Sequence, residues 1–500
     1  MNYMTSRRSM TESKFRGLAS ELLANIFSSL PRRDLVHVVL VCKSFYLSGC
    51  LLLYQHVDLR SDDLYIRSTL DLLRDHESIE KKIVSAVLTT MPTTMPHPYS
   101  HSQSQDTQLV AWINPYITKR WSNLKSLKLR GYPFSDIWAS DVFLNTLHNS
   151  CQQLRYFTYR PEFGALPSNF DLTGLHGVTW HSGPGTEDMP IMPTLSSSRH
   201  AITRISFTGT IIFRSDIQYY IFLDLRFPSL EYLELGSLVD ANDAARANTK
   251  VTEFILAHPR IEHLSLGRTR PAIDNGGPGA RDSFFQFDGS LLRRESLPSL
   301  KSFEGFLENI SMLARHAVNS LFSINSLSIY CPYQERKLME KVLEMQEAVT
   351  QAHMTLKKFP FVTYLRFELF AELHHMMPLN TTSLTHRTCM DHLSQLCPGV
   401  VSWYGRLPPM TSEHLSSMFG MYDNVETISL PQPTLFIHIG SSELAYFRPI
   451  AVKCTNLKKV IARKLEYTEE KNQIFMLNRD ADGNLTSVTA LATPDEHCLH

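Results

Sequence analysis

The sequence predicts an α/β chain in which a small helical segment near the N-terminus is followed by a long solenoid of strand–helix repeats. Two observations support this prediction. Residues 18–45 carry apolar side chains at the spacing of amphipathic helices. From residue 120 onward, an apolar residue followed by others three and five positions later recurs twelve times, on average about 30 residues apart.

Composition limits the classes of protein that this chain can belong to. It has 500 residues, of which 43% are hydrophobic and 20% charged, so a large core, several domains or an elongated array are all possible. Lys and Arg together equal Asp and Glu, at 49 each. This balance argues against a surface that binds nucleic acid or an anionic membrane throughout, and we expect neither partner.

The cysteines and the N-terminus indicate a reducing compartment. The eight cysteines are scattered, none lies in a C-x-x-C pair, and we expect free, mostly buried thiols without a zinc site. Residues 1–14 are polar with no apolar stretch behind them, and no apolar run is long enough to span a membrane. We therefore expect a cytosolic or nuclear protein.

The helical segment begins with a wide apolar stripe. Leu22, Leu23, Ile26, Phe27 and Leu30 lie on one face of a helix for which Ser20 is a candidate N-cap. Pro31 either ends this helix or begins the next one. A second helix is expected to start at Asp34, to carry Leu35, Val38, Val39, Val41 and Cys42, and to end near Phe45. Such short helices carry more apolar surface than they can hide, which indicates either a partner or a larger helical core.

The order of these residues resembles the F-box family. The resemblance rests on Leu18-Ala19-Ser20-Glu21-Leu22-Leu23, then Ile26-Phe27, Leu30, Asp34-Leu35 and Val41-Cys42-Lys43-Ser44-Phe45. The family usually has proline where this chain has Ala19. The resemblance implies an F-box helical domain over residues 15–60 that docks on a Skp-type adaptor and, through it, on a cullin-RING ubiquitin ligase. By position, the implied adaptor-binding residues are Leu18, Leu22, Leu23, Ile26, Phe27, Leu30, Asp34, Leu35, Val38, Cys42 and Phe45.

The repeat motif predicts a strand whose core residues are the first apolar residue and those at +3 and +5. The twelve copies begin at Leu124, Leu154, Leu175, Ile202, Leu230, Ile261, Leu300, Ile324, Val362, Val400, Val425 and Leu457. Helical patterns lie between several of them, at 141–154, 250–257, 336–356, 390–396 and 412–419. Strand, turn and helix at this period resemble a leucine-rich-repeat horseshoe of roughly twelve irregular repeats over residues 121–477. The alternative is a set of ordinary alternating strands in an α/β domain.

The remaining segments are assigned by composition. Residues 1–14 are expected to be a flexible N-terminus, and residues 61–120 a connecting region. That region holds a helix, a first irregular strand near 83–88 and a flexible loop at 89–106. Residues 478–500 are expected to be a polar, unstructured tail.

Strand alternation exposes positions +2, +4 and +6 of each repeat on the face away from the core. These positions hold eight Lys or Arg residues and three Glu residues, together with several tyrosines. Arg and Tyr are frequent at binding hot spots, so we expect this face to bind an acidic or phosphorylated protein segment. The candidate target-binding residues are Lys128, Arg130, Arg160, Arg204, Tyr330, Tyr364, Arg366, Tyr404 and Arg406. The alternative is a solvated strand face.

The sequence carries no motif for chemistry. It has no phosphate loop, dinucleotide fingerprint, H-E-x-x-H or nucleophile elbow, and 480–484 favours a polar turn over a calcium loop. We therefore expect no catalytic residue, metal or cofactor. The predicted function is the substrate-recognition subunit of a Skp-cullin-F-box ubiquitin ligase. The alternative is a non-catalytic repeat scaffold without ligase function.

Overall fold

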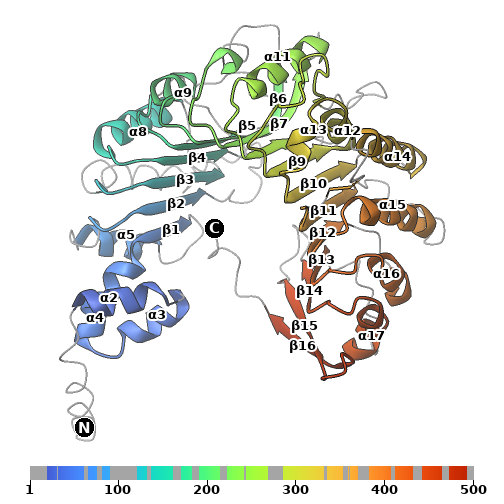
Figure 1. Cartoon of the computed structure of the whole chain (residues 1–500). Coiled ribbons are helices and arrows are strands. Elements are labelled where there is room, and N and C mark those ends of the chain that lie inside the picture. The colour runs from blue at the N-terminus through green and yellow to red at the C-terminus, as the bar shows by residue number, and fades with distance from the viewer. Residues whose placement is uncertain are drawn as a thin grey trace, which may run out of the picture. The chain divides into compact units, whose positions relative to one another are not determined.

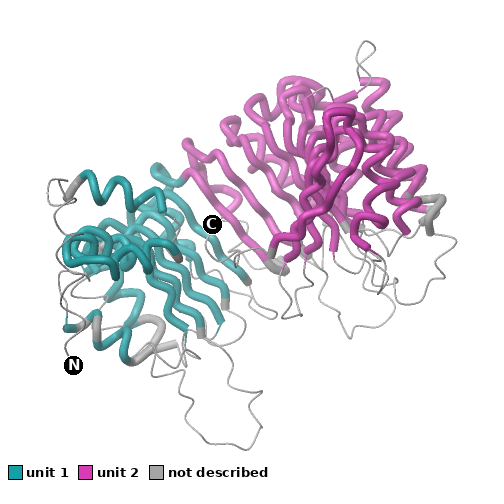
Figure 2. The backbone as a smooth tube through the Cα atoms, turned by 90° about the horizontal axis from the view of Figure 1, so that it is seen from below, with its two compact units in different colours: residues 1–202 teal, residues 203–500 magenta. Residues whose placement is uncertain are grey.

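The computed structural model describes most of the chain as two compact units, residues 1–202 and residues 203–500 (Figure 2). The described residues are 20–30, 32–60, 66–75, 81–90, 121–131, 137–161, 171–182, 191–213, 222–240, 244–267, 285–331, 335–352, 358–359, 361–369, 382–406, 411–431, 442–463 and 472–492. The predicted flexible N-terminus at 1–14 and most of the predicted loop at 89–106 lie outside them. Thr89 and Thr90 still belong to a strand.

Unit 1 combines a helical segment with parallel strands. Its elements are α2 (Ser20–Ser28), α3 (Arg32–Val39), α4 (Lys43–Leu53), β1 (His56–Arg60), α5 (Ile66–Asp75), β2 (Ser85–Thr90), β3 (Ser126–Gly131), α8 (Ile137–Ser150), β4 (Tyr156–Pro161), β5 (Gly177–Ser182) and α9 (Met192–Ser198). The strands β1 to β5 pair in chain order, all parallel. Parallel neighbours need a crossover between them, which the intervening segments supply.

The helical segment is a three-helix cluster with its own small core. Leu23 and Phe27 from α2 pack against Leu35 and Val39 from α3, and all four are buried. Phe45 of α4 closes the cluster with an edge-to-face contact to Phe27, with ring centroids 5.1 Å apart. Apolar side chains at helical spacing therefore meet in one core, as the sequence predicts.

The prediction of one continuous helix from Asp34 to Phe45 is wrong. Helix α3 ends at Val39, because Leu40 and Val41 donate their N–H groups to the carbonyls three residues back, at 3.3 and 3.1 Å. Cys42 then adopts an extended backbone, and its carbonyl accepts the first hydrogen bond of α4, from Tyr46. Beyond the break, α4 packs on both α2 and α3.

Unit 2 is a longer array of the same kind. Its strands are β6 (Arg204–Phe213), β7 (Tyr232–Asp240), β8 (His263–Leu266), β9 (Ser302–Phe306), β10 (Ser326–Cys331), β11 (Tyr364–Leu369), β12 (Ser402–Arg406), β13 (Thr427–Pro431), β14 (Lys459–Arg463), β15 (Gln473–Arg479) and β16 (Leu485–Ala492). Its helices are α11 (Ala244–Leu256), α12 (Leu307–His316), α13 (Val318–Leu321), α14 (Glu335–Ala352), α15 (Thr382–Leu396), α16 (Ser412–Phe419) and α17 (Glu443–Lys453). Strands β6 to β14 pair in chain order and are parallel.

The helices of unit 2 cover one face of its sheet. Helices α14, α15, α16 and α17 follow one another along the outer side of β10 to β14, each packed on the next (Figure 1). Among the described residues of unit 2, no helix lies on the opposite face of these strands. One sheet face is therefore core and the other is available for contacts.

The burial pattern confirms the predicted strand positions. The twelve copies of the repeat motif coincide with β3 to β14, and the first, +3 and +5 positions are buried wherever they hold a hydrophobic residue. In β10, for example, Ile324, Leu327 and Ile329 are all fully buried. The irregular strand predicted near 83–88 is β2, with Ile83, Ala86 and Leu88 buried in the same way. Strand β1 was not predicted, although Val57 and Leu59 follow the same alternation.

A hydrogen-bond pattern that the sequence cannot reveal repeats at the start of the strands. At β2 to β5 and at β7 to β14, two successive N–H groups donate to one carbonyl of the preceding repeat. Asn325 and Ser326 donate to the Lys301 carbonyl, and Thr363 and Tyr364 to that of Asn325. This shared acceptor sets the register of each strand on its neighbour and satisfies backbone donors that would otherwise be buried without a partner.

Polar side chains link the turns that precede the strands. The Nδ2 groups of Asn424 and Asn456 donate to carbonyls of the preceding repeat, at 3.2 and 2.8 Å. Buried His258 accepts from the Phe227 N–H at Nε2, 2.9 Å away, while its Nδ1 lies 2.6 Å from the Phe254 carbonyl. A neutral ring with its proton on Nδ1 satisfies both contacts.

The prediction of an unstructured tail from Asn478 is wrong for the described part of that segment. Strands β15 and β16 form an antiparallel hairpin, and β15 pairs antiparallel with β14. Asp480 accepts from the Asn484 N–H at 2.8 Å, and Gly483 has a φ of +83°, which makes 480–484 the polar turn that the sequence favours. The hairpin is held because Phe475 is buried against Phe447, with ring centroids 5.0 Å apart. Arg479 also donates to the carbonyls of Ala451 and Cys454 at the end of α17.

Replacing Phe475 tests whether the hairpin belongs to the folded unit. Phe475→Ala should lower the free energy of unfolding by about 3–5 kcal/mol, because it empties a closed apolar site at the end of the sheet. Leu491→Ala, on the same hairpin but 47% exposed, should change it by less than about 0.5 kcal/mol. Urea denaturation of both variants measures the difference. Equal, small effects would mean that the hairpin is not part of the core.

The buried His258 predicts a pH dependence of stability. Burial lowers the pKa of His258, so below its ordinary value of 6.5 the unfolded chain takes up a proton that the folded chain does not. The free energy of unfolding should therefore fall as the pH drops below 6.5. His258→Gln should reduce that slope, and the exposed control His200→Gln should keep it. An identical slope in both variants, from denaturation series at several pH values, would contradict the assignment.

Candidate interaction surfaces

The three-helix cluster exposes apolar side chains that its own core does not use. Leu22 and Ile26 on α2 are 49% and 47% exposed, and Leu40 and Val41 in the turn after α3 are 76% and 64% exposed. Of the twelve large hydrophobic residues exposed in the described chain, seven lie in this cluster: Leu22, Ile26, Val36, Leu40, Val41, Tyr46 and Leu47. We call these seven side chains the apolar patch. Such a concentration on a small motif indicates a surface that a partner covers.

The structure divides the predicted adaptor-binding residues into two groups. Leu22 and Ile26 are exposed on α2, and Asp34 is exposed in the first turn of α3. Leu30, Val38 and Phe45 are partly buried against the small core, and Cys42 is partly buried in the turn. Leu18 and Ala19 lie outside the described residues.

Three of the predicted adaptor contacts are corrected. Leu23, Phe27 and Leu35 are only 3–4% exposed, because they form the core between α2 and α3. Their side chains cannot reach a partner without unfolding the cluster, so they hold the helices in place. Five other residues of the cluster are exposed although they were not among the predicted adaptor-binding residues: Val36, Leu40, Val41, Tyr46 and Leu47. Leu40 and Val41 lie in the break between α3 and α4, which the apolar pattern did not reveal.

In unit 1, basic side chains collect on the sheet face opposite the core. Lys128 and Arg130 on β3 are partly exposed, and Arg160 on β4 is exposed. Arg130 lies opposite Arg160 in the strand register, and His181 follows on β5. Burial and the nearby Arg160 guanidinium both lower the pKa of His181. The structure therefore brings together the three predicted target-binding residues of this unit.

In unit 2, one basic residue of the same face, Arg366, is paired with a carboxylate. The Arg366 guanidinium donates to Glu368 on its own strand from Nε at 2.9 Å and from Nη2 at 2.6 Å. Although burial opposes its charge, Tyr330 and Glu368 raise the pKa of Arg366, which remains a cation. Because its charge is already balanced, Arg366 is a weaker candidate for an acidic partner than predicted.

The assignment of Tyr330 to the target-binding face is wrong. Tyr330 is 1% exposed, and its hydroxyl donates to Glu304 on the neighbouring strand. Tyr364 and Tyr404 are partly exposed and stack on each other with ring centroids 4.8 Å apart. Arg204 is exposed, with its guanidinium carbon 3.8 Å from the ring centre of Tyr232. The backbone of Arg406 lies opposite Glu368 in the register, and its side chain is outside what the structure describes.

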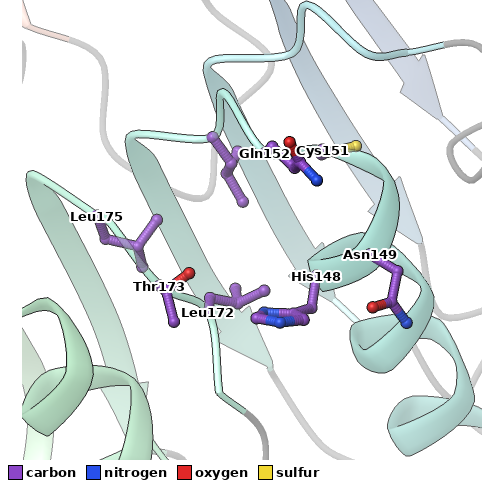
Figure 3. A pocket seen from close by; sticks show the side chains of 8 residues that line it. His148, Asn149, Cys151, Gln152, Leu172, Thr173 and Leu175 are labelled. Carbon is purple, nitrogen blue, oxygen red and sulfur yellow. The ribbon is translucent and has the colours of Figure 1, made fainter.

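A pocket in unit 1 is lined in part by a histidine and a cysteine that are near neighbours in the sequence, at the end of α8. Its lining includes His148, Asn149, Cys151, Gln152 and Leu175, and the His148 ring and the Cys151 sulfur point in different directions (Figure 3). The Cys151 thiol donates to the Trp121 carbonyl at 3.6 Å, and burial raises the pKa of this thiol to about 12. Cys151 is therefore a protonated structural thiol at neutral pH, and this pair is not a catalytic dyad.

The described residues contain neither a metal-binding cluster nor a helix suited to cross a membrane. No group of three or more His, Cys, Asp or Glu side chains in the described ranges is placed to hold a metal ion. None of the described helices combines the length and the apolar character needed to cross a bilayer.

The comparisons with known proteins bear on the helical cluster. A family model described as F-box-like matches residues 20–60, which span α2, α3, α4 and β1. This match confirms the F-box resemblance for that segment. Comparison with curated proteins gives no match for the chain. The F-box-like domain therefore coincides with the apolar patch.

Thiol reactivity tests the burial of the cysteines. The seven described cysteines are free, as expected, and all except the partly buried Cys42 are buried. Iodoacetamide at pH 8 should modify Cys42 in the native protein faster than Cys151 or Cys397, because burial raises the pKa of both buried thiols. Peptide mass spectrometry measures the rates. Rapid native labelling of Cys151 would contradict the structure, and labelling in urea should abolish the differences.

Proposed function

We propose that this chain is the substrate-recognition subunit of a Skp-cullin-F-box ubiquitin ligase. The F-box-like domain at residues 20–60 suggests a role in binding the Skp-type adaptor of such complexes. The observation that carries the proposal is that this same segment holds the apolar patch, whose side chains are exposed and lie outside the cluster's own core. The adaptor would cover Leu22 and Ile26 on α2 and the side chains of the turn between α3 and α4.

The strand–helix array would hold the target protein. The repeated core positions, the parallel strands in chain order and the helices on one face support a leucine-rich-repeat solenoid with about twelve irregular repeats. Such an array offers the sheet face opposite the helices as an extended binding surface. The chain itself would do no chemistry. It would raise the effective concentration of target lysines beside a ubiquitin carrier held by other subunits, in the cytosol or the nucleus.

The alternative function is a repeat scaffold that binds the same target without promoting its ubiquitination. Both functions use the same sheet face, so the sheet alone does not separate them. The F-box-like segment favours the ligase, because a scaffold has no need for an adaptor-docking helical domain. The half-life of the bound target in cells, with and without the apolar patch, separates the two.

Charge substitutions on the apolar patch test adaptor binding. In co-expression with a Skp-type adaptor, Leu22→Asp/Ile26→Asp should abolish co-purification, since each exposed apolar anchor of an interface can contribute about 2 kcal/mol or more. Both positions are about half exposed, so the double variant should fold as the wild type does.

The matched control is Phe361→Asp/Val452→Asp, which places the same charges on exposed apolar residues of unit 2, 60% and 67% exposed. This control should keep the adaptor. Loss of the adaptor from both variants, or from neither, would show that the apolar patch is not the docking surface. Circular dichroism of each purified variant reports whether it is folded.

A further inference from the structure

We propose that two copies of this chain associate through the free edge of strand β16 and form a symmetric dimer. The two β16 strands pair antiparallel across a two-fold axis, so that one sheet continues into the other. Three observations support this dimer: the place of β16 in the sheet, the exposure of its side chains and its lack of charge. The dimer involves neither the adaptor nor the target, so it is independent of the proposed function.

Strand β16 lies at an edge of the sheet. Among the described strands it has one neighbour, β15, and the two form an antiparallel ladder (Figure 1). In such a ladder, every second residue directs its N–H and C=O groups away from the neighbouring strand. An edge strand therefore presents a row of hydrogen-bonding groups that another strand can use. From residue 487 to residue 492 the ladder has no register shift, so this stretch is a regular template for pairing.

The side chains of β16 are open to solvent and carry no charge. Exposed along the strand are Thr486, Ser487, Thr489, Ala490 and Leu491, the last at 47%. The strand contains no Asp, Glu, Lys or Arg, in a chain of which 20% of the residues are charged. Edge strands commonly carry charged residues or proline, which prevent pairing with other chains. Strand β16 has none of these residues.

Strand β1 is an edge of a different kind. Among the described strands it pairs only with β2, and it is five residues long, whereas β16 is eight residues long. Strand β1 carries Asp58 and Arg60, whose charged groups lie 3.9 Å apart. Short length and charge are features that protect an edge from pairing. Strand β16 is therefore the described edge that suits association.

The lack of charge favours a second copy of the same strand as the partner. A charged strand would place like charges opposite each other when it pairs with itself, and an uncharged strand does not. Antiparallel pairing about a two-fold axis gives both copies the same contacts and closes the assembly at two chains. With the axis at Val488, this residue faces its own counterpart, and Ser487 faces Thr489 twice. Pairs of β-branched residues and of hydroxyl side chains are favourable on neighbouring strands.

Apolar side chains gather beside this edge. Outside the helical cluster, five large hydrophobic residues of the described chain are exposed, and two of them are Val452 on α17 and Leu491 on β16. These two elements pack on each other. On the open face, Ile461, Ile474 and Leu491 form a row across β14, β15 and β16. Stacked repeats usually end in a polar outer surface, so an apolar row that stops at an uncharged edge fits a surface that is covered in the assembly.

The mass of the full chain in solution tests the dimer. Size-exclusion chromatography with light scattering at micromolar concentrations should give twice the 57.2 kDa of one chain. Ser487→Lys/Thr489→Lys and Ser487→Glu/Thr489→Glu should each weaken the dimer by at least about tenfold, because each variant places like charges opposite each other. An equimolar mixture of the two variants should restore the dimer, because opposite charges then face each other.

The matched control is Leu343→Lys/Phe361→Lys, which adds the same charge at apolar positions of unit 2 that are 45% and 60% exposed and lie outside β16. This control should keep the mass of two chains. Circular dichroism of every variant reports whether it is folded, and co-purification of the Skp-type adaptor is measured on the same preparations.

Several results would overturn the dimer. A wild type with the mass of one chain at every concentration would do so, as would a dimer that survives in both like-charge variants or is not restored by their mixture. A mass that keeps rising above two chains would mean that β16 pairs with a different edge, because only an unlike pair of surfaces allows open growth. A single chain that still co-purifies with the adaptor keeps the proposed function and loses only this inference.

Discussion

The parallel register of the strands is the constraint on which the rest of the structure depends. Strands β2 to β5 and β7 to β14 start by donating two N–H groups to one carbonyl of the preceding repeat, and this fixes which residues lie opposite one another. Because side chains alternate along a strand, the register puts the first, +3 and +5 residues into the core. It leaves +2, +4 and +6 on the other face. A shift by one residue would bury Arg366 and expose Phe367, so the hydrophobic pattern and the hydrogen bonds enforce the same arrangement.

The same constraint explains why charged residues behave differently along the array. In unit 2 the register aligns Tyr330 with Glu368 and Arg366 with Tyr404, so cations, carboxylates and aromatic rings interleave. In unit 1 it aligns Arg130 with Arg160 on neighbouring strands. The helical cluster is organised differently. Four buried side chains form its core, and seven other apolar residues are exposed. Two surfaces of different chemistry therefore belong to one unit: an apolar one on helices and a basic one on strands.

The sequence predicted the strands better than the helices or the sites, and the reasons are physical. The core positions of β3 to β14 could be predicted from the sequence, because strand alternation depends only on residues a few positions apart. The apolar stripe alone did not show that Leu22 is exposed and Leu23 is buried. The stripe is wider than the area of α2 that α3 and α4 cover. Tyr330 occupies a position that alternation marks as exposed, and only the neighbouring Glu304 and Phe306 show why it is buried. The hairpin of β15 and β16 was missed because its polar residues resemble a tail, whereas Phe475 and Arg479 tie it to α17.

In the proposed function, the chain separates adaptor docking on the helical cluster from target binding on the sheet. Hydrogen–deuterium exchange of the full chain, with and without a saturating Skp-type adaptor, tests it most directly. We expect added protection of the amides of α2, α3 and α4, and unchanged exchange in β3 to β14. Protection that spreads over the strands, or no added protection in the three helices while the adaptor is bound, would contradict it.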